Sequence, residues 1–305
     1  MSDQPSQRAR KLLQGAYDTH IHVGPDVVER KIDDISLARR FQEIGMAGFI
    51  LKSHYTSTAE RAAVVRKAVP GIDALGAIAL NRAVGGMNPL AVEIAAREGA
   101  RTVWMPTVDS VNESHEREAP PGAKVPVWVK LQLDLREQGI EIPPVPVLDA
   151  HGSPLPEVLE VLGMIARHKM CLATGHLGRD EIFAVVDAAV DAGVETIVVT
   201  HPEFPSQDLS VDDQNALANK GALLERCFTT PHTGKVTWER WTQNIRDAGP
   251  ERSVLSTDLG QVFNPPVEDG MALMVDRLFD AGFTEEEIYV MAVVNTRLVA
   301  GAEAL

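Results

Sequence analysis

The sequence predicts an α/β fold, a (β/α)8 or TIM barrel. Strand-like and helix-like patterns alternate along the 305 residues, which is typical of a parallel α/β architecture. Eight short apolar runs can be counted as strands, and several of them end directly at a histidine or an aspartate. A barrel of this kind takes about 250 residues. One barrel with an insertion therefore accounts for the length, and we expect a single domain over residues 1–305.

The first third of the chain is expected to hold four strands. The first begins near Gly15 and ends before Gly24-Pro25, which breaks the chain. Ser57 and Glu60 form a capping-box pattern that begins a later helix. The segments expected after the first strand are a helix over 35–44, a strand over 47–52, a helix over 57–67, a strand over 72–80, a helix over 88–99 and a strand over 101–105.

Four further strands are expected after residue 168. Each is a short apolar run followed by glycine, proline or polar residues, as expected where a parallel strand leaves a barrel. Thr237 begins a helix between the last two strands, and Thr284 with Glu287 caps the final helix. The four strands are expected at 169–175, 195–200, 222–229 and 253–257.

One irregular stretch separates the fourth strand from the fifth. It runs from about residue 108 to 167, and Pro156 begins the helix that precedes the fifth strand. A loop this long in a compact domain is usually functional or an interface. We therefore interpret 108–167 as an insertion that is either a lid over the barrel mouth or an oligomer contact. A homo-oligomer is expected.

The segment Asp18-Thr19-His20-Ile21-His22 contains the strongest functional motif. Side chains alternate between the two faces of a strand, so His20 and His22 point the same way and Ile21 points into the opposite layer. Two imidazoles on one rigid element can hold a metal ion, but two histidines alone do not complete a metal site. Further ligands must come from elsewhere in the chain.

Three later strands supply such ligands at their carboxyl ends. The run 169–175 ends at His176, the run 195–200 ends at His201, and the run 253–257 ends at Asp258. Each residue alone is weak evidence, because a histidine after an apolar run is often only a hydrogen-bonded polar residue. Together with the first strand, the four strand ends predict a metal site.

Composition limits the range of partners. The 29 Lys and Arg residues against 43 Asp and Glu residues give a net charge of −14, which disfavours binding to nucleic acid or to an anionic membrane surface. A small-molecule substrate is expected instead. No apolar run approaches the roughly 18 residues of a membrane span, and the first residues lack a secretory signal. Cys171 and Cys227 lie in apolar runs and are expected to be buried free thiols in a cytoplasmic protein.

The ordered set of strand-end residues resembles the amidohydrolase superfamily, metal-dependent hydrolases built on a distorted (β/α)8 barrel. Asn295-Thr296-Arg297-Leu298 is similar to the Asn-Pro-Ala-Arg segment that often follows the last strand, with Thr296 in place of proline. The resemblance implies that His20, His22 and Asp258 hold a first metal and that Asp258 also moves protons. It implies further that the two later histidines, His176 and His201, bind a second metal or contact the nucleophilic water and the substrate.

The fourth strand departs from this pattern. Members with two metals carry a bridging carboxylated lysine or a glutamate there, and this strand has neither in Thr102-Val103-Trp104-Met105-Pro106. Lys52 ends the second strand instead. Three interpretations of Lys52 compete: a carboxylated bridging ligand on another strand, a cation that binds a substrate carboxylate, and an ordinary lysine that reaches solvent.

Other side chains are weaker candidates. We expect His54 and Arg179 to contact the substrate, although Arg179 also stands at a helix start, where solvation would explain it. Glu225 could face the pocket or form an ion pair. Asp18 could orient a ligand or cap the end of its strand.

The predicted function is hydrolysis of a small amide, cyclic amide or lactone. Histidine and carboxylate ligands suit zinc, with Mn²⁺ or Fe²⁺ as alternatives, and one or two ions are expected. An open coordination position allows the ion to lower the pKa of a water to about 7, and Asp258 then acts as the proton shuttle. The alternative is a metal-dependent decarboxylase or other lyase of the same superfamily, which the missing ligand on the fourth strand favours.

Overall fold

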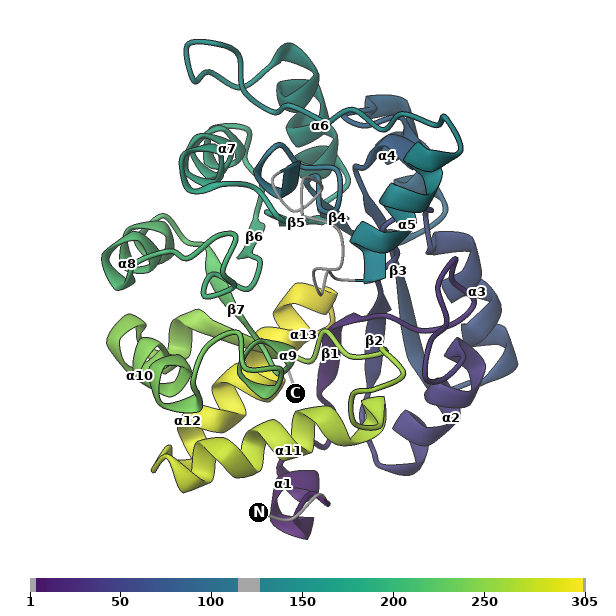
Figure 1. Ribbon diagram of the computed structural model, residues 1–305. Helices are drawn as coiled ribbons and strands as arrows, with labels where there is room; N and C mark the ends of the chain where they lie inside the picture. Colours follow the sequence, from purple (N-terminus) through teal and green to yellow (C-terminus); the bar gives the residue numbers. More distant parts are fainter. Residues whose placement is uncertain (1–3, 115–126, 304–305) are drawn as a thin grey trace.

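A computed structural model describes residues 4–114 and 127–303. Its eight strands form one parallel sheet in which each strand pairs with the next along the chain. Helices surround the strands (Figure 1). The strands are β1 (Tyr17–Ile21), β2 (Gly48–Leu51), β3 (Asp73–Ala79), β4 (Ala100–Trp104), β5 (Cys171–Ala173), β6 (Thr196–Val199), β7 (Leu223–Cys227) and β8 (Ser253–Ser256).

The sheet closes where the end of β1 meets the residues that follow β8. The Asp258 N–H donates to the His20 carbonyl at 2.8 Å, and the His22 N–H donates to the Leu259 carbonyl at 2.7 Å. The buried carboxylate of Asp18 accepts from the backbone N–H of Thr257 at 3.0 Å and from its hydroxyl at 2.6 Å. These contacts confirm the predicted (β/α)8 barrel and show that Asp18 ties β1 to the end of β8.

The helices follow the expected order. They are α1 (Gln7–Leu12), α2 (Asp34–Glu43), α3 (Ala59–Ala68), α4 (Pro89–Arg97), α5 (Val127–Glu137), α6 (Pro156–Arg167), α7 (Arg179–Asp191), α8 (Val211–Asn219), α9 (Thr229–His232), α10 (Trp238–Ala248), α11 (Val267–Asp280), α12 (Glu285–Tyr289) and α13 (Asn295–Ala300). A π-helical turn, Val290–Val294, joins the last two. In the described part of the chain, no helix is both long and apolar enough to span a bilayer.

Capping explains where most helices begin. Thr237 caps α10, and Thr284 with Glu287 forms the predicted capping box of α12. The capping box predicted at Ser57 is wrong, because α3 begins only at Ala59. Its N-cap residue, Thr58, does not cap either: the Thr58 hydroxyl donates to the Leu51 carbonyl at 2.7 Å and so joins the helix start to β2.

Apolar side chains, most of them small but with Trp104 among them, form a cluster in the barrel interior, and two larger apolar clusters pack between the strands and the helices. Helix α13 lies at the amino-terminal end of the strands, where the Thr296 hydroxyl accepts from the Tyr17 N–H at 3.2 Å. Cys171 and Cys227 are buried and free, as expected. The interior cluster consists of Ile50, Ala77, Ala79, Trp104, Cys171, Ala173, Val198, Val254 and Val299.

The structure narrows the predicted insertion 108–167. Helix α6 packs against β5 and between α4 and α7, so it is the barrel helix of this unit and not part of an insertion. The inserted part therefore ends before Pro156. Residues 115–126 of it lie outside the described residues. A role as lid or oligomer contact stays a prediction.

Asn295 is expected to contribute to the stability of the barrel. Its buried amide donates to the carbonyl of Ser253 at 2.7 Å and to that of Glu251 at 3.0 Å, which fixes α13 at the start of β8. Asn295→Ala leaves these carbonyls without their donor and should lower the free energy of unfolding by about 1 to 3 kcal/mol. Chemical denaturation measures the change, with the exposed Asn219→Ala as the control. Equal unfolding midpoints for both variants would contradict this role.

Candidate metal centre

Three predicted ligands converge at the carboxyl end of the barrel. His20 lies in β1 and His22 directly follows it, and both side chains are buried. One oxygen of Asp258, Oδ1, lies 3.2 Å from Nε2 of His20 and 3.1 Å from Nε2 of His22. The ligand atoms of the three residues all lie within 4.8 Å of one another. This spacing is suited to a single ion between them.

The backbone holds Asp258 in an unusual conformation. Its φ of 54° lies in the left-handed region, and its other carboxylate oxygen accepts from the Thr229 hydroxyl at 2.9 Å. Two residues further on, a Cβ at Gly260 would lie 1.4 Å from the His22 carbonyl oxygen. Only glycine allows the chain after β8 to approach β1 this closely.

Glu225 of β7 contacts His20 on the side of its Nδ1 atom. Its carboxylate oxygens lie 3.1 and 3.2 Å from Nδ1 of His20, and they also accept from the Ser256 hydroxyl at 3.0 Å. Burial alone would raise the pKa of Glu225, but the neighbouring His20, His201 and Lys52 lower it to about 2. Glu225 therefore pairs with His20 and is not among the residues that line the pocket, which favours the ion-pair alternative of the sequence analysis.

This arrangement fits a bound cation. A neutral His20 that donates its Nδ1 proton to Glu225 presents a lone pair at Nε2. That lone pair faces Oδ1 of Asp258, which is also an acceptor, at 3.2 Å. With Nε2 unprotonated, two acceptors at this distance need a positive charge between or beside them. The same carboxylate-to-imidazole support is typical of histidine ligands in metal sites.

Lys52 contacts the same nitrogen of His20. Its Nζ lies 2.9 Å from Nε2 of His20 and 5.2 Å from the ring centre of Trp104. Burial lowers the pKa of Lys52, while the carboxylates of Asp258 and Glu225 favour its charged form. The solvent-reaching interpretation of Lys52 is wrong, because the residue is only 2% exposed.

His176 and His201 form a second group on the other side of the pocket. Their ring centres are 5.0 Å apart, and that of His201 is 6.3 Å from His20. Glu113, from the loop after β4, places Oε1 3.0 Å from Nδ1 of His176 and accepts from Ser206 at 2.9 Å. Sequence reasoning missed Glu113, because it stands in a charged stretch without any periodic pattern.

Burial favours the neutral form of four histidines that line the pocket. It lowers the pKa of His22, His54 and His176, and it lowers the pKa of His201 to about 3. Neutral imidazole is the form that binds metals. Nδ1 of His22 and Nδ1 of His201 are also buried without a hydrogen-bond partner among the described residues. The neutral form suits metal ligands, whereas these two Nδ1 atoms lack a supporting partner of the kind that His20 has in Glu225.

A deeper set of potential ligands suits a metal less well. Sγ of Cys227 lies 3.8 Å from Nδ1 of His20, and Glu225 completes the set. Burial, followed by the charges of Glu225 and Asp258, raises the pKa of the Cys227 thiol well above its usual value. Since metals bind the thiolate, this set is unfavourable for an ion.

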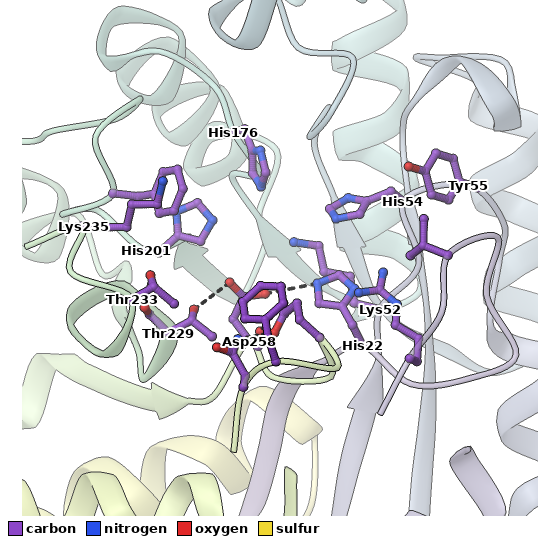
Figure 2. Close-up of a pocket in the computed structure, with 16 residues that line it drawn as sticks. His22, Lys52, His54, Tyr55, His176, His201, Thr229, Thr233, Lys235 and Asp258 are labelled. Atoms are coloured by element: carbon purple, nitrogen blue, oxygen red, sulfur yellow. Dashed lines mark hydrogen bonds and ion pairs between the residues drawn. The ribbon is translucent and has the colours of Figure 1, made fainter. Parts of the chain in front are cut away.

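The candidate ligands open onto a cavity of about 400 Å³. In Figure 2, His201, Thr229, Thr233 and Lys235 lie on one side of Asp258, and the second side holds His22, Lys52, His54 and Tyr55. The lining residues are His22, Val28, Arg30, Lys52, His54, Tyr55, His176, His201, Phe204, Thr229, Thr233, Lys235, Asp258, Gln261, Phe263 and Asn264.

The structure places His54 in this pocket but not Arg179. Nδ1 of His54 lies 2.8 Å from the Thr107 hydroxyl, and its ring stacks on His22 at 4.9 Å between centres. The predicted substrate contact of Arg179 is corrected. Arg179 stands at the start of α7, and its exposed guanidinium pairs with the neighbouring Asp180 and with Asp213 of α8. Arg179 is not among the residues that line the pocket. Arg30 and Lys235, which the sequence did not single out, are the additional cations of the lining.

Solved structures confirm the fold of eight parallel strands surrounded by helices. An amidohydrolase from Pseudomonas aeruginosa superposes with a TM-score of 0.61 at 12% identity, over 96% of this chain and 99% of that one. A protein assigned as a 2-pyrone-4,6-dicarboxylic acid hydrolase of Pseudomonas putida gives 0.59 at 15% identity, over 95% and 99%. A zinc-containing amidohydrolase from Burkholderia multivorans gives 0.54 at 12% identity, over 94% and 99%.

The sequence itself identifies a family. Residues 15–225 match the model of a family of unknown function, DUF6282, and the chain belongs to that family. The match includes His20, His22, His176, His201 and Glu225, whereas Asp258 lies beyond it. Among curated proteins, none matches this chain in sequence.

Glu225→Gln should weaken metal binding without unfolding the barrel. The amide keeps the shape of the side chain but removes the charge that supports the Nδ1 proton of His20. Loss of such a supporting carboxylate typically costs about 10- to 100-fold in metal affinity. Competition with a chromophoric chelator measures the affinity, and Glu160→Gln on the exposed face of α6 is the matched control. Unchanged affinity in Glu225→Gln would show that Glu225 does not support a ligand.

Proposed function

We propose that this protein is a metal-dependent hydrolase of a small amide, cyclic amide or lactone. The convergence of His20, His22 and Asp258 on one point at the floor of a pocket is the observation that carries this proposal. In barrels of this kind the carboxyl ends of the strands carry the active site. The fold shared with amidohydrolases supports the same reaction class.

His20, His22 and Asp258 would hold the metal, and His176 and His201 face the same pocket as further ligands or substrate contacts. We propose zinc, because imidazole and carboxylate suit it and because the similar Burkholderia multivorans amidohydrolase contains zinc. A bound divalent ion polarises a carbonyl and makes water a better nucleophile at neutral pH. The lactone alternative is supported by the similar protein assigned as a 2-pyrone hydrolase, since a 2-pyrone is a lactone.

Asp258 is proposed to move the proton. Its side chain is 19% exposed and lines the pocket, while Thr229 fixes one of its oxygens. The carboxylate can therefore accept a proton from the attacking water and donate it to the leaving nitrogen or oxygen. His54 and His176, both neutral, line the same cavity and can hydrogen-bond the polar groups of the substrate.

A decarboxylase or other lyase is the second candidate. Trp104 ends β4, where enzymes with two metals carry a bridging residue, and its ring lies 5.5 Å from that of His20. This position supports a site with one ion, which the lyases of the superfamily use. Release of carbon dioxide from the substrate would favour the lyase, and release of an acid with an amine or alcohol would favour the hydrolase.

Asp258→Asn should lose nearly all activity. The amide cannot take up a proton, and loss of general acid-base help lowers kcat by about 10² to 10⁴. Steady-state kinetics on the zinc-loaded protein measures kcat, and Asp280→Asn at the exposed end of α11 is the control. Chelation should also abolish wild-type activity, and zinc should restore it. More than about a tenth of wild-type kcat in Asp258→Asn, with chemistry rate-limiting, would contradict the role.

Lys52→Arg distinguishes the two remaining roles of Lys52. We propose that Lys52 acts as a cation, because its Nζ lies beside His20 and faces the ring of Trp104. Lys52→Arg should then keep the wild-type metal content, and Lys52→Ala should raise KM. A guanidinium cannot be carboxylated into a bridging ligand, so a loss of one metal ion per chain in Lys52→Arg would instead establish the bridging role. Elemental analysis and KM measure the two effects.

A further inference from the structure

Part of the pocket lining consists of apolar side chains, which cannot bind a metal ion. Val28, Phe204 and Phe263 contribute to it, and Phe263 is 70% exposed. An aromatic ring left in solvent beside a cavity offers a surface for the apolar part of a ligand. The lining therefore suits a substrate with an apolar, preferably planar body.

Most neutral polar groups of the lining already have partners within the protein. The Thr229 hydroxyl donates to Asp258 and the Thr233 hydroxyl donates to the Thr229 carbonyl. The amide of Gln261 donates to the Asp258 carbonyl, and that of Asn264 donates to Gln261. These contacts shape the wall but leave few donors for a charged ligand.

The cationic side chains of the lining differ in whether they already have a partner within the protein. Arg30 forms an ion pair with Asp26 at 2.6 Å, and Lys52 contacts His20. Lys235, in the loop between α9 and α10, is exposed and has no carboxylate partner in the part of the chain that the structure describes. Its Nζ lies 5.3 Å from the ring centre of Phe204. Lys235 thus places an uncompensated positive charge beside an aromatic surface.

We propose that the substrate is a small carboxylic acid with an apolar ring, whose carboxylate binds Lys235. The ring would contact Phe204 and Phe263, and the reactive group would lie at His20, His22 and Asp258. This assignment of the reactive group rests on the proposed hydrolase function. A carboxylate fits better than a phosphate, since phosphate sites gather several backbone N–H groups at a helix start or glycine loop, and Lys235 is a single ammonium.

Binding of isophthalate and of 3-acetylbenzoate, neither of which has a bond that a hydrolase could cleave, to the zinc-loaded protein tests the proposal without catalysis. The two compounds have nearly the same shape and differ by one negative charge. Wild-type protein should bind isophthalate about tenfold more tightly in calorimetry, the difference expected for one charge-assisted hydrogen bond. Lys235→Gln should bind both compounds equally, and Lys235→Arg should retain most of the preference.

The matched control is Lys67→Gln at the exposed end of α3, which should preserve the wild-type preference. A preference that persists in Lys235→Gln would assign the charge recognition to the metal or Lys52 and overturn the proposal. Failure of isophthalate to bind at millimolar concentration would overturn it as well. A Lys235-dependent preference in a protein without hydrolase activity would uphold the carboxylate site and reject only the proposed function.

Discussion

The candidate site depends on the way in which the barrel closes. The backbone N–H groups of His22 and Asp258 each donate to a carbonyl across the seam between β1 and the residues after β8. These two bonds set the distances from Asp258 to His20 and His22, two candidate ligands that precede it by more than 230 positions in the chain. Gly260 makes the close approach possible, and the Asp18 carboxylate holds the seam from the β1 side. The same contacts therefore close the barrel and bring the candidate ligands together.

Two histidines of the candidate site each have a carboxylate beside the Nδ1 atom of the ring. Glu225 in a strand contacts Nδ1 of His20, and Glu113 in a loop contacts Nδ1 of His176. A carboxylate beside Nδ1 favours a proton on that nitrogen, so Nε2 is the ring nitrogen that can face an ion or a substrate. Nζ of Lys52 contacts the other ring nitrogen of His20, Nε2, at 2.9 Å. The protein thus orients its ligands by interactions among its own side chains.

The sequence predicted the strands and the ligand set for a clear physical reason. Apolar runs define parallel strands, and parallel strands end at one face, so His22, His201 and Asp258 had to meet. Glu113 could not be found in this way, because its loop has no period. Glu225 alternates with two neighbours that are also buried, and burial on both faces of a strand removes the pattern that would show which face is inside. Arg179 was misplaced because its partner, Asp213, lies on another helix.

The left-handed backbone at two site residues has a consequence for the evolution of the protein. Asp258 has a φ of 54° and His201 a φ of 26°, conformations that cost a residue with a side chain of order 1 to 3 kcal/mol. Selection for stability alone would therefore favour glycine at both positions. The chain nevertheless carries a carboxylate and an imidazole at these two positions, and both line the pocket of the proposed site. Engineering this barrel for thermostability by consensus or by computed energies would erode these positions first unless they are held fixed.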